Sequence, residues 1–220
     1  MLQGEFSSGG LGQAMVRRRV RVPIGSGEAD FFTFHGLVDG REHLALGLGP
    51  WTGGATPLVR IHSECLTGDV FASGKCDCGE QLQEAITAIT KVGGILLYLR
   101  QEGRGIGLYN KLDAYSLQAQ GLDTYEANRR LGLGDDLRDY TVARQMLDAL
   151  GVERVRLLTN NPDKVAQLEK LGIQVEEQVS TGVFLKPANR HYLEAKVAVT
   201  KHRLRIPKVA EQLAAVPAHA

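Results

Sequence analysis

The sequence predicts a single α/β domain in which helices flank a mixed sheet and the N-terminal part is rich in strands. Between residues 20 and 48, short apolar stretches separated by Gly, Asp and Ser are typical of antiparallel strands. From residue 58 onward, apolar runs typical of buried strands alternate with stretches of helical spacing. The composition, 43% hydrophobic and 23% charged, is that of an ordinary globular domain.

The N-terminal part contributes most of the strands that we expect to be antiparallel. Residues 1–15 are rich in Gly and Ser and are expected to form a flexible leader before a domain at 16–205. Arg17, Arg18 and Arg19 form a short basic cluster, which we expect on an exposed strand edge. The expected strands of this part are 20–24, 31–37, 43–48 and 58–61.

The rest of the chain alternates helices with buried strands. Apolar spacing and the glycines that follow it predict helices, and continuous apolar runs predict buried strands at 95–99 and 155–158. Asn161 and Pro162 supply an N-cap and a first-turn proline for a helix that ends before Gly172. The expected helices are 82–92, 108–119, 125–131, 143–150, 162–171 and 189–202, followed by a flexible tail at 206–220.

The charge balance and the lack of a long apolar run exclude two classes of partner. Lys plus Arg number 26 and Asp plus Glu number 25, so the net charge is +1. A dedicated nucleic-acid binder would be strongly basic, and no apolar run reaches the roughly 18 residues that a membrane span needs. Because the start also lacks an apolar signal segment, we expect a cytoplasmic protein with reduced thiols that binds neither nucleic acid nor membrane.

The three cysteines, Cys65, Cys76 and Cys78, lie within fourteen residues of one another. An odd number argues against a closed disulfide framework, and the clustering favours a metal site. Three thiolates would hold one Zn²⁺ per subunit and leave the fourth position to water, as in catalytic zinc sites. A closed structural site with a distant fourth ligand such as a His, or cysteines that are simply buried apolar residues, are the alternatives. A nucleobase deaminase fits poorly, because the pair is Cys-x-Cys without a preceding proline.

A glycine-rich loop, Gln-Glu-Gly-Arg-Gly-Ile-Gly at 101–107, follows the buried strand at 95–99. Loops after strands are where α/β proteins bind ligands, and glycines let the backbone approach a ligand closely. Glu102 could accept from the N–H-rich edge of a base, and Arg104 could contact a phosphate. A tight turn with solvated charges is the alternative.

Five stretches together resemble the GTP cyclohydrolase II family, which opens the guanine ring of GTP at the start of riboflavin synthesis. They occur in order over about residues 58–204, whereas residues 1–57 match the family weakly. The stretches are 60–69, 76–79, 100–107, 120–128 and 158–162.

The resemblance implies a set of functional residues, and with it zinc on Cys65, Cys76 and Cys78, Mg²⁺ on the GTP phosphates, and a homodimer. Tyr115 would help ring opening and formate release. Asp136 would accept a proton, and Arg138 would act at the α-phosphate. The implied GTP contacts are Arg60, Ile61, His62, Ser63, Glu64, Gln81, Glu102, Gly103, Arg104, Thr124, Thr159 and Lys164.

Elementary chemistry agrees with part of this assignment. Thr159 to Lys164 span a strand end and a helix N-terminus, which favour an anion. Without the family, Tyr115 would be read as a core tyrosine and Lys164 as a surface lysine. Asp136 and Arg138 would share a face in an irregular segment. Because a protonated guanidinium is a poor nucleophile, we expect Arg138 to stabilise phosphoryl charge rather than form a covalent bond.

Three functions follow as hypotheses. The first is the full reaction, with release of formate and pyrophosphate to give 2,5-diamino-6-(5-phosphoribosylamino)pyrimidin-4(3H)-one. The second is a specialised paralog that stops at the formamidopyrimidine nucleotide. The third is a non-catalytic GTP-binding sensor. Departures from the family pattern keep the second open: Lys75 stands where an Arg is usual, and residues 178–181 alter the loop expected after the last strand.

Overall fold

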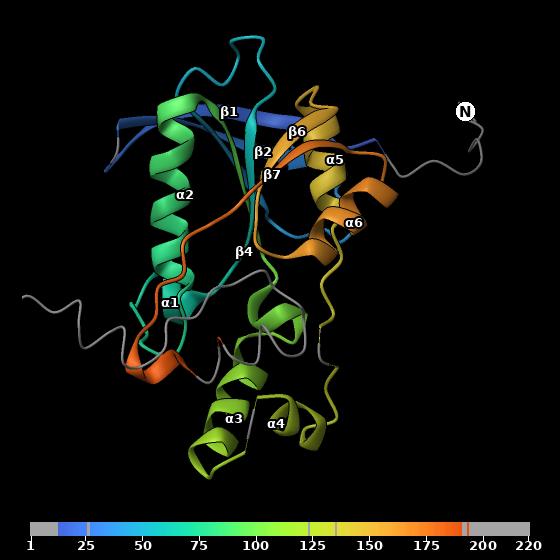
Figure 1. Cartoon of the computed structure of the whole chain (residues 1–220). Coiled ribbons are helices and arrows are strands. Elements are labelled where there is room, and N and C mark those ends of the chain that lie inside the picture. Colours follow the sequence, from blue (N-terminus) through green and yellow to red (C-terminus); the bar gives the residue numbers. More distant parts are fainter. Residues whose placement is uncertain (1–12, 26, 123, 135, 191–192, 194–220) are drawn as a thin grey trace, which may run out of the picture.

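The computed structural model describes residues 13–25, 27–122, 124–134, 136–190 and 193 (Figure 1). The strands are β1 (Met15–Ile24), β2 (Gly27–His35), β3 (Leu44–Leu48), β4 (Leu58–Ser63), β5 (Gly94–Leu99), β6 (Arg154–Leu158) and β7 (Gln174–Val179). The helices are α1 (Leu66–Asp69), α2 (Cys78–Val92), α3 (Leu108–Ala119), α4 (Thr124–Arg130), α5 (Thr141–Ala149) and α6 (Pro162–Lys170), with 3₁₀ turns η1 (Glu102–Gly105) and η2 (Pro187–Asn189).

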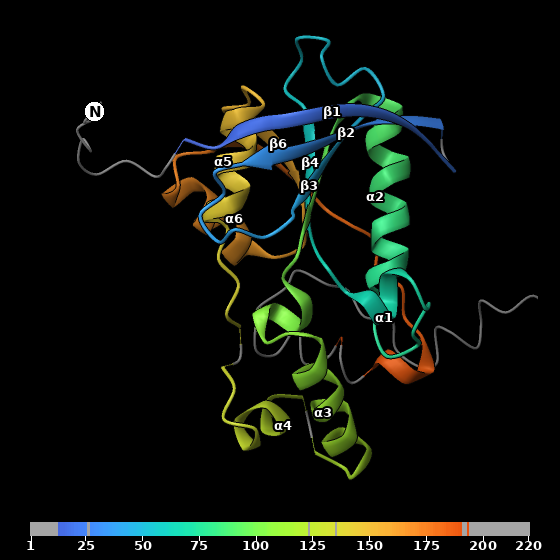
Figure 2. The ribbon, with the colours of Figure 1, turned by 180° about the vertical axis from the view of Figure 1, so that it is seen from behind.

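The strands form one seven-stranded mixed sheet in the order β1-β2-β3-β5-β4-β6-β7. The pairs among β1, β2, β3 and β5 are antiparallel, and those among β5, β4, β6 and β7 are parallel. In Figures 1 and 2, α2 covers one face of the sheet and α5 and α6 cover the other. This arrangement confirms the predicted α/β class with a strand-rich N-terminal part.

Two hydrophobic cores, one on each face, hold the layers together. Alternate residues of a strand point to opposite faces, and β4 shows this directly: Val59 and Ile61 pack toward α5 and α6, whereas Leu58 packs toward α2. On the α5 side, Met146 and Leu147 are fully buried. On the other side, Ile89 of α2 is fully buried as well.

Within the described residues the expected elements up to residue 171 are present with shifted ends, and one strand was not expected. β1 begins at Met15, five residues before the expected strand, and its arginines Arg17 to Arg19 are exposed, as expected. β7 was missed, because Gln-Val-Glu-Glu-Gln-Val lacks the apolar character of a buried strand. Residues 178 and 179, expected in a loop, therefore belong to β7. Residues 1–12, most of the expected helix 189–202 and the tail 206–220 lie outside the described residues.

The connections place a switch point at β4, in the parallel part of the sheet. The chain passes from β4 through α2 to β5 on one side, and β6 lies on the other side of β4. Ligands of α/β proteins bind outside the carboxyl ends of strands at such a point. α3 and α4 lie beyond these ends in both views (Figures 1 and 2). Within the described residues, no helix has the length and apolar character needed to cross a membrane.

Candidate active site

Loops from the carboxyl ends of β4, β5 and β6 meet at a cavity of about 650 Å³. β4 contributes its own last residues and Cys65, β5 leads into η1, and β6 leads into Thr159 to Asn161. α3 adds Lys111 and Tyr115 from beyond the sheet. The cavity therefore occupies the position that the topology favours for a ligand.

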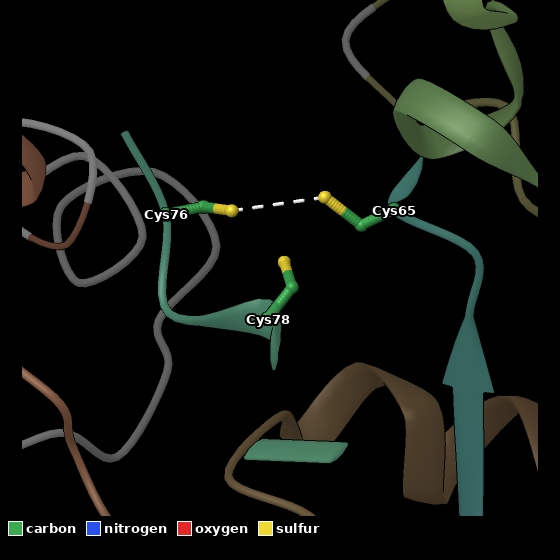
Figure 3. Close-up of side chains that lie close together, drawn as sticks. All are labelled: Cys65, Cys76 and Cys78. Carbon is green, nitrogen blue, oxygen red and sulfur yellow. Dashed lines mark hydrogen bonds between the residues drawn. The ribbon is translucent and has the colours of Figure 1, made fainter. Parts of the chain in front are cut away.

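The three cysteine sulfurs point toward one another at one wall of this cavity (Figure 3). Cys65 is the N-cap of α1, directly after β4, and Cys76 and Cys78 lie where α2 begins. The three sulfurs lie within 4.8 Å of one another, and those of Cys65 and Cys76 are 3.7 Å apart. Zinc–sulfur bonds of about 2.3 Å at tetrahedral angles would separate two sulfurs by about 3.8 Å.

The surroundings of the sulfurs also suit a metal ion. A Cβ atom on Gly68 of α1 would lie 2.8 Å from Cys76 Sγ and 3.1 Å from Cys65 Sγ, so the position accepts only glycine without movement. Among the described residues, no His, Asp or Glu joins the three cysteines in a ligand cluster. A three-thiolate set facing a cavity fits zinc with an open fourth position better than a closed structural site.

Lys111 of α3 reaches the same cluster and was not identified from the sequence. Its Nζ donates to Cys65 Sγ at 3.1 Å, to Thr67 Oγ1 at 2.9 Å and to Glu102 Oε1 at 2.9 Å. The thiols of Cys76 and Cys78, together with this ammonium, hold the pKa of Cys65 far below that of an ordinary thiol. Lys111 lies one helical turn before Tyr115, so helical spacing could have placed both on one face.

Asp69 at the end of α1 is a second residue whose role the sequence did not reveal. Its carboxylate accepts from His62 Nε2 at 3.1 Å, from the Tyr98 hydroxyl at 2.8 Å and from the Cys65 N–H at 3.0 Å. Burial lowers the pKa of His62, so its ring is neutral at pH 7. Asp69 therefore fixes the His62 tautomer with the proton on Nε2. It also links the His62 ring to the backbone of Cys65.

β4 presents buried polar atoms that lack partners among the described residues. They are Arg60 Nε, His62 Nδ1 and Ser63 Oγ, and all three residues line the cavity. The rest of the Arg60 guanidinium is held by Leu158 O at 3.1 Å and Gln81 Oε1 at 2.9 Å. Buried polar groups are almost always hydrogen-bonded. Three unsatisfied groups along one cavity wall thus indicate a polar ligand.

The glycine-rich loop is tightly folded, and its acidic residue is largely occupied. Gly103 and Arg104 both adopt left-handed backbone conformations, with φ of 63° and 61°. The Glu102 carboxylate accepts from Leu66 N at 2.7 Å and Gly103 N at 2.9 Å in addition to Lys111. A carboxylate has about four acceptor positions. The reading of a base edge by Glu102, expected from the sequence, is therefore limited to one remaining position in this arrangement.

Asp136 and Arg138 share a face, as their spacing predicts. Arg138 Nε donates to Asp136 Oδ1 at 2.8 Å, and its Nη2 donates to Oδ2, which makes the pair bidentate. Burial would raise the pKa of Asp136, but the hydrogen bonds and charge of Arg138 outweigh it and lower the pKa. The Leu137 N–H donates to Arg104 O at 3.0 Å, which ties this segment to the glycine-rich loop.

The end of β6 and the start of α6 form the basic side of the cavity. Asn161 caps α6 by accepting from Asp163 N at 3.0 Å. Lys164 is buried rather than a surface lysine, and its Nζ donates to Ile61 O at 2.9 Å. Thr159 is also buried and lines the cavity. A helix N-terminus with a nearby ammonium group favours an anionic ligand.

Tyr115 faces the cavity as the sequence hypothesis requires. Burial raises the pKa of its hydroxyl to about 12, so it stays protonated at neutral pH. The ammonium groups of Lys75 and Lys111 lie 5.0 and 5.7 Å from its ring centroid. Thr124 begins α4, and its side chain is not among those the structure describes.

The structure thus brings nearly all the predicted site residues together. Asp136 is not among the residues that line the cavity, and it supports Arg138, which is. The residues that line the cavity are Arg60, Ile61, His62, Ser63, Glu64, Cys65, Cys76, Cys78, Gln81, Glu102, Gly103, Arg104, Tyr115, Arg138, Thr159 and Lys164.

Known proteins of one family are similar to this chain over most of its length. The family model described as GTP cyclohydrolase II matches residues 15–180. A GTP cyclohydrolase-2 of Vibrio cholerae is 56% identical over 197 residues, which cover 88% of this chain and 100% of the relative. The enzymes of that name from Vibrio parahaemolyticus and Hahella chejuensis are 53% and 52% identical, covering 88% and 84% of this chain and 100% and 89% of theirs. The family match spans residues 15–180 and so includes β1 to β3, for which we expected a weak likeness.

Proposed function

The chain belongs to the GTP cyclohydrolase II family of hydrolases, and we propose that it opens the imidazole ring of GTP at C8 in riboflavin biosynthesis. The reaction releases formate and pyrophosphate and gives 2,5-diamino-6-(5-phosphoribosylamino)pyrimidin-4(3H)-one. The proposed catalytic domain is residues 16–205, acting in the cytoplasm as a homodimer.

One observation carries this proposal furthest: the unsatisfied polar atoms of Arg60, His62 and Ser63 share a cavity with the three cysteine sulfurs. A buried polar atom without a partner costs about 1–3 kcal/mol. That cost is removed when a polar substrate supplies the missing donors and acceptors. GTP offers such groups on its base, ribose and phosphates.

The basic groups of the cavity support binding of the triphosphate. Lys164 and the N-terminus of α6 favour an anion, and Arg104 and Arg138 add two guanidinium groups at the cavity. We expect Mg²⁺ to accompany the phosphates, since phosphoryl transfer usually requires it. Arg138 stabilises charge that develops on the phosphoryl oxygens.

The bidentate pairing with Asp136 supports this electrostatic role of Arg138 over a covalent one. A guanidinium that donates two hydrogen bonds to a carboxylate is held in its protonated form. The same pairing lowers the pKa of Asp136, which makes its carboxylate a weaker base. The pairing therefore favours a role for Asp136 in orienting Arg138 over a role as proton acceptor.

At the other wall, Cys65, Cys76 and Cys78 would hold zinc. Bound there, zinc supplies a Lewis acid and an activated water for hydrolysis at an electrophilic carbon. The chain's own groups complete the site. The neutral His62 ring is aligned by Asp69, and the protonated Tyr115 hydroxyl is available as a hydrogen-bond donor for ring opening and formate release.

The first experiment quantifies the products. Metal-analysed protein is incubated with GTP and Mg²⁺, and formate, pyrophosphate and the nucleotide are measured by NMR and mass spectrometry. Equal amounts of formate and pyrophosphate with the diaminopyrimidinone monophosphate are expected. Pyrophosphate with a retained formyl group would instead indicate the truncated reaction. Tight GTP binding without either product in zinc-replete protein would overturn the enzymatic function.

A matched pair of variants tests the cavity itself. Ser63→Ala removes an unpartnered buried hydroxyl at the cavity, and Thr33→Val removes one on β2, away from it. Loss of one hydrogen bond to substrate is worth about 0.5–1.5 kcal/mol, so Ser63→Ala should lower kcat/KM for GTP roughly 2- to 10-fold. Thr33→Val should leave it unchanged, and equal effects of the two variants would contradict this binding mode.

A further inference from the structure

Lys111 is buried at the junction of three segments that the proposed reaction requires. It lies on α3, where its side chain is 11% exposed, and its three donors are directed to three different groups. Those groups are the Cys65 sulfur, the Thr67 hydroxyl on α1 and the Glu102 carboxylate in η1. An ammonium group has three donors, so this geometry uses all of them.

The chemistry of the partners makes this more than a structural contact. Three thiolates and one Zn²⁺ carry a net charge of −1, and an uncompensated buried charge is costly. The Lys111 ammonium group offsets the −1 of the metal and its thiolates, and the Glu102 carboxylate that also pairs with it returns the net charge of the cluster to −1. An N–H···S hydrogen bond also withdraws electron density from the sulfur, and such bonds tune the metals that cysteines hold.

The link to Glu102 couples this charge to the cavity. Glu102 Oε1 accepts from Lys111, while Oε2 accepts from Leu66 N at 2.7 Å, next to Cys65. The ammonium thus holds the metal-binding sulfur and the glycine-rich loop in one arrangement.

We propose that Lys111 is a positioning residue of the metal centre, which donates to the Cys65 thiolate, balances its charge and holds it in register with Glu102. This inference rests on the zinc centre of the proposed function. In this role Lys111 would increase the affinity of the site for the metal and lower the electron density on the Cys65 sulfur. Neither effect follows from the family motif.

The test uses the full-length protein loaded with Zn²⁺ or Co²⁺. Zinc affinity is measured by chelator competition, and the sulfur-to-cobalt charge-transfer band is measured by absorption. Lys111→Met should bind zinc about 10- to 100-fold more weakly, with the cobalt band at longer wavelength because Cys65 becomes more electron-rich. Glu102→Gln frees the ammonium group for the sulfur, so its band should move to shorter wavelength.

Lys75→Met is the matched control. Lys75 is exposed, lies beside Cys76 and contacts the same Tyr115 ring, but it shares none of the three hydrogen-bond partners of Lys111. Its removal should leave zinc affinity and the cobalt band at wild-type values. A Lys111→Met band and affinity equal to those of Lys75→Met would overturn the proposal.

Three further outcomes keep the conclusions on Lys111 and on the zinc centre separate. If Lys111→Met does not fold, an unmoved band in Glu102→Gln overturns the proposal, since that variant keeps the shape of the side chain. Wild-type protein that binds neither zinc nor cobalt would refute the zinc centre itself. Wild-type protein that binds metal, with bands unmoved in the variants, would refute only the role of Lys111.

Discussion

Replacing Gly68 with alanine tests the metal site by geometry alone. Gly68 is buried in α1, and its substitution adds one methyl group without changing charge or hydrogen bonding. The new Cβ atom would lie 2.8 Å from Cys76 Sγ, 3.1 Å from Cys65 Sγ and 3.1 Å from Cys78 Cβ. A single methyl group would therefore press on all three cysteines at once.

The expected size of the effect follows from these distances. Non-bonded heavy atoms settle at about 3.5–4.0 Å, so the contact with Cys76 Sγ is short by about 1 Å. Metal–ligand distances hold to about ±0.2 Å, several times less than the movement needed. Disturbing the support of a metal ligand typically weakens binding 10- to 100-fold, which is about 1.4–2.7 kcal/mol. Helix propensity acts in the opposite direction, because Ala in a helix is about 1 kcal/mol better than Gly.

The assay is zinc stoichiometry and affinity by chelator competition, together with thermal unfolding with and without chelator. Gly74→Ala is the matched control, because Gly74 lies in the same cysteine loop and its added Cβ would meet only Ala188 Cβ at 3.6 Å, an ordinary contact. Gly68→Ala should lose zinc at chelator concentrations that Gly74→Ala and wild type resist. Equal zinc retention in all three proteins would refute the assignment of this cradle to a metal ion.

Three further predictions use other parts of the molecule. Arg138→Ala should lower turnover of GTP about 10²- to 10³-fold, and mass spectrometry of denatured wild-type protein should find no nucleotide on Arg138, whose covalent modification would contradict the electrostatic role. The hydrogen bond from Arg19 lowers the pKa of Asp30. The folded state therefore binds fewer protons there, and its stabilising effect is present above the unfolded pKa of about 3.9 and is lost as the pH falls through the folded pKa. Asp30→Asn should accordingly flatten the acid limb of thermal stability, and an unchanged limb would disprove this origin. Asn161→Ala removes the α6 N-cap and should cost about 1 kcal/mol in denaturant unfolding.

The sequence predicts well those elements that are determined by their own residues rather than by a neighbouring strand. The run at 95–99 is buried on both faces, so its apolar continuity alone identifies β5. β7 could not be found this way, because its Glu176 and Glu177 face solvent and pair with Arg154 and Arg156 of β6 at 3.3 and 2.6 Å. An edge strand of this kind is specified by its neighbour, which a single sequence does not display.

The candidate site likewise contains residues that the sequence reveals and residues that only the folded structure reveals. Residue types that chemistry requires, such as Cys65 and its two neighbours, are visible as a motif. Lys111 and Asp69 are not, because an ordinary helical lysine and an ordinary acidic residue become functional only through the contacts that the fold creates. The predicted role of Glu102 in reading a base edge could not take account of the two donors, Leu66 N and Lys111 Nζ, that reach it from other segments.

These contacts explain why ligand-binding capacity is concentrated on β4. Most charged side chains around the cavity use hydrogen bonds to hold one loop to the next: Glu102 joins η1 to α1, and Lys164 joins α6 to β4 through Ile61 O. Groups committed in this way fix the shape of the cavity but offer less to a substrate. Buried polar atoms that have no hydrogen-bond partner among the described residues can still bond to a ligand. Three of these atoms lie on β4. Because β4 is central in the sheet, with β5 and β6 paired on either side, its backbone is fixed before a ligand binds, which reduces the entropy lost on binding.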